Sequence, residues 1–149
     1  MPSQLPLETL IGLAREHADE AARSLGRLNR ERQNAEHQLG MLQDYRHDYL
    51  VRLQQAMQTG MSTSDCHNYQ RFISTLDDAI NQQVAALDTL NVNHEKSRLH
   101  WQQQQRKLNA FDTLAQREAR AAQVVAERRE QRASDEHSAR LASQRHSFY

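Results

Sequence analysis

Residues 58–65, QTGMSTSD, decide the fold of this 149-residue chain. Gly60 can end a helix, because glycine takes the left-handed conformation after a helix C-terminus at no steric cost. Ser62 and Asp65 have the spacing of a capping box, which starts a new helix. A short break between two long helices favours an antiparallel pair. The stretch therefore predicts a turn over 60–64 that joins the two arms of a helical hairpin.

The arm before the turn carries a sustained heptad repeat. With Leu7 at position d and Ile11 at position a, thirteen of the fifteen a and d positions between residues 7 and 56 are apolar. Arg32 and Arg46 are the two exceptions. A 3.5-residue period of this length predicts a coiled coil over 6–59. Five of the thirteen residues are alanine, so the seam is narrow and buries little area per heptad.

The arm after the turn, predicted over 65–116, has its own repeat, which turns polar between His94 and Gln104. Folding at the turn pairs residue i with about residue 122 − i. A polar extension over 117–149, with seven arginines and five acidic residues, continues past the end of the first arm. It is predicted to be helical or disordered and to fray toward the C-terminus, and residues 1–5 are expected to be flexible. The two repeat series are Ile73, Ile80, Leu87, His94, Trp101, Leu108, Ala115, Ala122 and Leu76, Gln83, Leu90, Ser97, Gln104, Phe111, Glu118, Val125.

Composition supports an all-α chain without a thick core. The four glycines and two prolines are too few for the frequent turns of a β-sandwich, and the mean hydropathy is −0.92. No apolar run approaches the length of a membrane span, and no signal peptide is expected. The formal net charge is zero, which gives no general attraction to nucleic acid or anionic lipid. The single cysteine, Cys66, cannot form an internal disulfide, which is consistent with a reducing compartment.

The sequence contains no pattern that supports catalysis or cofactor binding. The eight histidines are scattered, without an i, i+4 pair or a neighbouring second cysteine, so we expect no metal site. There is no phosphate loop or nucleophile elbow, and a two-helix hairpin lacks a concave pocket. We therefore predict that the protein is not an enzyme and uses no cofactor. Gly12, Gly26 and Gly40 recur on one heptad face, which indicates either coincidence or the close approach of another chain.

Four of the eight aromatic residues lie within 28 residues around the turn: Tyr45, Tyr49, Tyr69 and Phe72. In one interpretation they pack against each other and close the end of the hairpin. In the other they form an exposed patch for a protein partner, because tyrosine and phenylalanine are enriched in interfaces. The sequence leaves both interpretations open.

Five segments, taken in order, resemble a known family. Residues 38–49 resemble the L-x-x-L-x-x-Y-x-x-x-Y block of the FliJ proteins, and residues 69–80 resemble that family's F-x-x-x-L-x-x-A-I helix start. Trp101 in its polar stretch, residues 114–117 and residues 130–136 are similar to the later blocks. The ordered set covers nearly the whole chain.

The resemblance implies a component of the flagellar type III protein export apparatus, with roles in flagellum biogenesis, protein transport and chemotaxis. Such proteins are stalks that bind the hexameric export ATPase FliI and its regulator FliH and contact the export gate FlhA. They also escort export chaperones. The implied location is cytoplasmic, peripherally associated with the cytoplasmic side of the cell membrane, without direct membrane insertion or nucleic-acid binding.

The family pattern also points to two sets of partner-binding residues. For the export gate, the hairpin half carries Gln38, Leu42, Tyr45, Tyr49, Phe72, Leu76, Ala79 and Gln83. For the export ATPase, the terminal end carries Arg117, Arg120, Arg128, Arg129 and Arg132. The heptad repeat places Leu42, Tyr49 and Leu76 in the seam, so these three are alternatively expected to hold the other residues in place.

Two other functions compete with this interpretation. One is a structural coiled-coil module that forms parallel oligomers with no turn at Gly60. The other is the equivalent stalk of a virulence-type secretion system. A nucleic-acid binder is a more distant alternative, because the extension carries a net charge of only +2.

Overall fold

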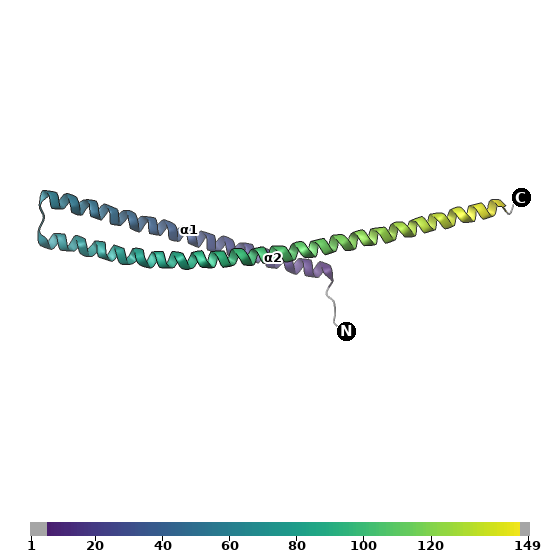
Figure 1. The fold of residues 1–149 in the computed structure, drawn as a ribbon, viewed down its shortest axis with the longest axis horizontal. Coiled ribbons are helices and arrows are strands. Elements are labelled where there is room, and N and C mark those ends of the chain that lie inside the picture. The colour runs from purple at the N-terminus through teal and green to yellow at the C-terminus, as the bar shows by residue number, and fades with distance from the viewer. Residues whose placement is uncertain (1–5, 147–149) are drawn as a thin grey trace, which may run out of the picture. The chain divides into compact units, whose positions relative to one another are not determined.

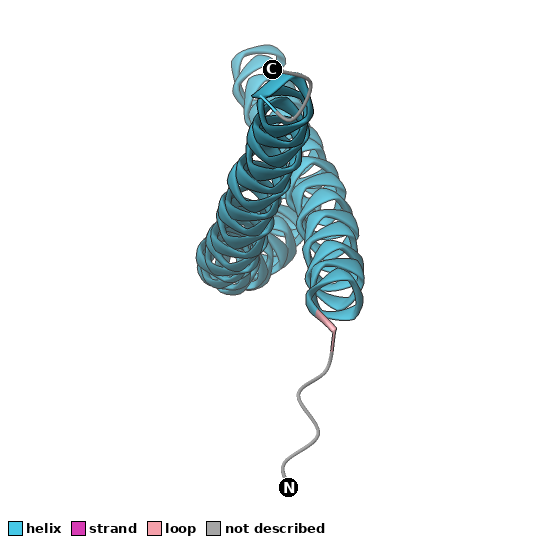
Figure 2. Ribbon diagram, turned by 90° about the vertical axis from the view of Figure 1, so that its right-hand side faces the viewer, coloured by secondary structure: helices cyan, strands magenta, loops and turns pink. Residues whose placement is uncertain are grey.

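The protein is all-α, as predicted. The computed structural model describes residues 6–146, and this range contains two helices and no strand (Figure 2). Helix α1 spans Leu7–Thr59 and helix α2 spans Thr63–His146. The expectations of a flexible segment at 1–5 and of fraying at the last three residues lie outside the described residues.

The turn between the helices has the chemistry that the sequence predicts. Gly60 has φ = 88°, in the left-handed region where a side chain would be strained. The hydroxyl of Ser62 accepts a hydrogen bond from the backbone N–H of Asp65 at 3.1 Å. The carbonyl of Ser62 also accepts the backbone N–H of Cys66 at 3.1 Å, which is the first hydrogen bond of the new helix. The chain thus reverses at Gly60, contrary to the alternative of a continuous parallel coil.

The chain divides into two compact units, and each helix contributes to both. The larger unit, residues 17–104, contains the turn and two antiparallel arms that lie side by side (Figure 1). The smaller unit combines the start of α1, up to Glu16, with α2 from Gln105 onward. Helix α2 continues without interruption through the predicted start of the extension at residue 117.

The heptad repeat of α1 coincides with its buried face. None of the fifteen predicted a and d residues is exposed, and five of them are buried. Four of the five are alanines with 3–6 % of their surface exposed: Ala14, Ala18, Ala21 and Ala35. Alanine side chains allow the helix backbones to approach closely but remove little apolar surface from water. The seam is continuous and thin.

The repeat of α2 is covered as far as Ala115. Ile73, Leu76 and Gln104 are its buried residues, and all three belong to the two predicted series. Beyond Ala115, the series members Glu118, Ala122 and Val125 are exposed, as is every described residue from Gln116 to His146.

Contacts between the two arms of the larger unit confirm the predicted register to within one residue. Arg46 pairs with Asp77, Tyr49 stacks on Phe72, and Gln38 accepts a hydrogen bond from Gln83. Each partner lies within one residue of the position predicted by pairing i with 122 − i.

The glycines on the first arm have open space: an added Cβ at Gly12 or Gly40 would meet no atom of the described chain within 4 Å.

The turn predicts opposite effects of one substitution at two glycines. Gly60→Ala forces a side chain into the left-handed region and is expected to lower the free energy of unfolding by about 1–2 kcal/mol. Gly40→Ala, in an open helical position, is expected to raise it by about 0.5–1 kcal/mol through helix propensity. Urea unfolding followed by circular dichroism measures both. Equal effects of the same sign would contradict the structural role of Gly60.

Candidate partner-binding surfaces

The hairpin half of the larger unit carries a cluster of aromatic rings, which we call the aromatic patch: Tyr45, Tyr49, Tyr69 and Phe72. Tyr49 is its centre. Its ring centroid lies 4.3 Å from that of Phe72 and 6.2 Å from that of Tyr69, in tilted arrangements. The guanidinium carbon of Arg52 lies 5.4 Å from the Tyr49 ring centroid, a cation–π contact. The two ring–ring contacts join the two arms near the turn, whereas the Arg52 contact lies within α1.

The aromatic patch combines both interpretations that the sequence leaves open. Tyr49 and Tyr69 are half-buried and pack across the hairpin. Tyr45 is 52 % exposed, and Phe72 is 43 % exposed even though it contacts Tyr49. Packing therefore holds some rings in place while two others present apolar surface to solvent, as a binding surface requires.

The other five predicted gate-facing residues differ in exposure. Gln38 is exposed, whereas Leu42, Ala79 and Gln83 are half-buried. Leu76 is only 8 % exposed, in the seam position that its heptad assignment predicts. Leu76 therefore has little surface to offer a partner, and its contribution is to the packing beneath the patch.

Polar contacts cross the hairpin next to the patch. Nε of Arg46 lies 2.5 Å from Oδ1 of Asp77. The side-chain amide of Gln83 donates hydrogen bonds to the backbone carbonyl of Ala35, at 3.0 Å, and to Oε1 of Gln38, at 3.3 Å. Sequence reasoning missed the Arg46–Asp77 pair. The signal was present, because the predicted register places Arg46, at an a position, opposite Leu76 and within one residue of Asp77.

The five predicted ATPase-facing arginines lie on the exposed part of α2, within the smaller unit. None of them forms an ion pair with another described residue. The segment has side-chain hydrogen bonds one helical turn apart, from Gln123 to Glu127 and from Gln131 to Asp135. The arginines are thus available to acidic groups of a partner. They are Arg117, Arg120, Arg128, Arg129 and Arg132.

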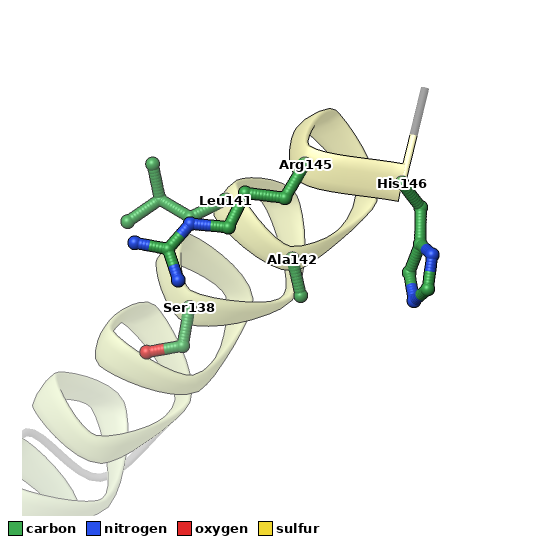
Figure 3. Close-up of a pocket in the computed structure, with 5 residues that line it drawn as sticks. All are labelled: Ser138, Leu141, Ala142, Arg145 and His146. Atoms are coloured by element: carbon green, nitrogen blue, oxygen red, sulfur yellow. The ribbon is translucent and has the colours of Figure 1, made fainter. Parts of the chain in front are cut away.

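A surface hollow in the described part of the chain is open to solvent. The hollow near the end of α2 is lined by Ser138, Leu141, Ala142, Arg145 and His146, which all project from one helix (Figure 3). It is a depression between neighbouring side chains and has no wall from a second element. Among the described residues, no group of three or more His, Cys, Asp or Glu side chains is arranged to hold a metal ion.

The perturbed titrations of the chain belong to a surface pair. The Arg98 guanidinium donates hydrogen bonds to the Glu95 carboxylate at 2.6 and 2.9 Å and holds the pKa of Glu95 below its usual value. The same pair raises the pKa of Arg98. Both side chains are exposed on one helix face, so the shift reflects a local i, i+3 ion pair. None of the described helices is long and apolar enough to cross a membrane.

Fold and surfaces together define a class of protein: a helical-hairpin coiled coil whose arms carry exposed aromatic rings and exposed arginines. The family model for the flagellar FliJ protein matches residues 3–147. The flagellar FliJ protein of Salmonella typhi is 38 % identical over 136 residues, covering 91 % of this chain and 92 % of the relative. That of Escherichia coli strain K12 is 36 % identical over the same length and coverage. The chain belongs to the flagellar FliJ family.

The different packing of two tyrosines predicts different effects on stability. Tyr49→Ala removes the ring that contacts Tyr69, Phe72 and Arg52 and is expected to lower the free energy of unfolding by about 1–2 kcal/mol. Tyr45→Ala removes a half-exposed ring and is expected to change it by less than about 0.5 kcal/mol. Urea unfolding compares the two variants, and a loss at Tyr45 equal to that at Tyr49 would argue that Tyr45 is a packing residue.

Proposed function

We propose that this protein is a soluble, non-catalytic component of the flagellar type III export apparatus that acts as a stalk. In this proposal it binds and promotes the hexameric export ATPase FliI together with its regulator FliH, contacts the membrane export gate FlhA and escorts export chaperones. It works in the cytoplasm, held at the inner face of the cell membrane through the apparatus. Family membership over nearly the whole chain is the observation that carries the proposal.

The aromatic patch supports the gate contact. Tyr45 and Phe72 expose rings on opposite arms of the hairpin, and the ring of Tyr49 lies against that of Phe72. Interfaces that must form and release rely on a few aromatic anchors within a polar surround. Two exposed rings held on a packed support provide such anchors without a large sticky surface.

The exposed arginines of α2 support the ATPase contact. An exposed ion pair between one of these arginines and an acidic group of the partner would contribute only about 0–1 kcal/mol. Several such pairs can attract the partner and still be broken repeatedly. A component that engages a ring of ATPase subunits during a working cycle needs contacts of this kind. The mixed-sign charge of the segment also limits non-specific attraction to other acidic molecules.

Alanine substitution of the two exposed rings tests the gate contact. Tyr45→Ala combined with Phe72→Ala is expected to weaken binding to a purified soluble part of FlhA about tenfold or more, because two aromatic anchors are lost. Helicity measured by circular dichroism is expected to stay at the parent level. Met57→Ala, at another exposed apolar residue of the hairpin, serves as a control and is expected to bind normally. Unchanged binding with intact helicity would exclude the patch as the gate surface.

Charge removal in α2 tests the ATPase contact. The triple variant Arg128→Gln, Arg129→Gln, Arg132→Gln is expected to reduce stimulation of FliI ATPase activity, and the parent effect is expected to weaken as salt rises. Arg23→Gln, Arg27→Gln, Arg30→Gln removes the same charge from exposed positions of α1 and is the matched control. Equal loss in both triples would indicate a general charge effect. No stimulation and no binding by the parent protein at any ratio would refute the stalk proposal.

A further inference from the structure

We propose that Arg46, Asp77 and Gln83 form a polar clamp that sets the register and rotation of the two arms at the aromatic patch. The polar clamp consists of the Arg46–Asp77 ion pair and the two hydrogen bonds donated by Gln83, to the carbonyl of Ala35 and to Gln38. Arg46 and Gln83 are then positioning residues. The effect of the clamp on register concerns the hairpin alone, and only its consequence for gate binding rests on the proposed function.

The seam alone specifies register poorly in this part of the hairpin. Between residues 22 and 52 of α1, Ala35 is the single buried residue, with 6 % of its surface exposed. A methyl group fits equally well against many opposing side chains, so an alanine layer discriminates weakly between alternative pairings. Arg32 and Arg46 occupy two of the a positions in the same stretch, where an apolar residue would otherwise pack. Polar residues at single a positions are a known means of specifying register at a cost in stability.

Gln83 occupies a position of the α2 repeat where an apolar residue would be expected. Its side chain extends across the seam toward Ala35 of α1. Its amide reaches the backbone carbonyl of Ala35 at 3.0 Å because the side chain at that position is only a methyl group. A backbone carbonyl cannot rotate away as a side chain can, so this hydrogen bond restricts how far α2 can turn about its own axis. The second hydrogen bond, to Gln38 at 3.3 Å, adds a contact one turn along α1.

The polar clamp and the turn lie on opposite sides of the Tyr49–Phe72 contact in the aromatic patch. Gly60 and the Ser62 cap determine where α1 ends and α2 begins on one side of the patch. Arg46 lies one turn from Tyr49 on the other side, and its partner Asp77 lies five residues after Phe72. With register set at both ends, the Tyr49 and Phe72 rings meet at 4.3 Å while Phe72 keeps its outer surface exposed.

This geometry divides the predicted gate-facing residues by role. The amide of Gln83 and the side-chain oxygen of Gln38 are engaged with each other, and Leu76 is buried. These three residues therefore determine where the patch lies and contribute less contact surface than Tyr45 and Phe72. Substitution of Gln83 is therefore expected to change the packing of the Tyr49 and Phe72 rings, and to affect partner binding through those rings more than through loss of a direct contact.

A charge-swap series tests the Arg46–Asp77 half of the polar clamp. In a Cys66→Ser background, spin labels on cysteines at the exposed positions Glu31 and Asn91 report the separation of the two arms beyond the clamp. Arg46→Asp is expected to broaden or shift the distance distribution, because two carboxylates then face each other. Arg46→Asp combined with Asp77→Arg is expected to restore the parent distribution. One heptad of slippage corresponds to about 10 Å along a helix, which this measurement resolves.

The matched control is Arg71→Asp, which makes the same charge change at an exposed arginine of α2. It is expected to leave the distribution unchanged. A parent-like distribution in Arg46→Asp would overturn the proposal, and so would failure of the swapped pair to restore it. Both readouts use the protein alone, so a failed gate-binding assay would bear on the proposed function and leave this result intact.

Leucine at position 83 separates positioning from stability. Gln83→Leu places an apolar side chain in the seam and is expected to leave the midpoint of urea unfolding unchanged or raise it. The nuclear Overhauser effects between the Tyr49 and Phe72 rings are expected to fall at least twofold. Gln82→Leu, at the exposed neighbouring position, is the control and is expected to preserve them. Parent-level ring effects in Gln83→Leu would overturn the role assigned to Gln83.

Discussion

The burial of a narrow, alanine-rich seam between α1 and α2 is the interaction on which the rest of the structure depends. An isolated helix of this polarity is marginal in water, and most helix stability in proteins comes from packing an apolar face. The seam supplies that face at 3.5-residue intervals from Leu7 to Leu53 on α1. Because many of the buried residues are alanines, each contributes little to the stability of the helix pair. The pair is stabilised by the large number of such contacts along the seam.

A thin seam leaves most of each helix to solvent, which accounts for the low mean hydropathy of −0.92. The exposed faces carry mixed charge and isolated apolar residues, so the protein can present several separate surfaces without one large apolar patch. The aromatic patch and the arginines of α2 are two such surfaces, built in different ways. One depends on rings packed across the hairpin, and the other depends on a helix face whose residues are all exposed.

Polar residues in the seam have a second consequence. Arg46 and Gln83 lower the apolar content of the repeat, yet both find partners on the opposite arm. Directional contacts of this kind define the pairing of helices where alanine layers do not. They lie next to Tyr49 and Phe72, where the orientation of side chains affects what a partner would meet. Polar residues in the seam thus lower the local stability of the helix pair and define the register and rotation of the two arms.

Sequence alone determined the all-α class, the reversal at Gly60, the heptad faces and a register accurate to one residue, because these follow from local conformational preference and periodicity. Pairing i with 122 − i places Arg46 opposite Leu76, one residue from its actual partner Asp77. Tertiary structure decided which residues of the candidate patch are exposed. Tyr49 and Phe72 meet, Leu76 is covered and Gln83 reaches the carbonyl of Ala35. Such contacts depend on the conformation of each side chain and on the rotation of each helix about its axis. The heptad repeat in the sequence specifies neither of these.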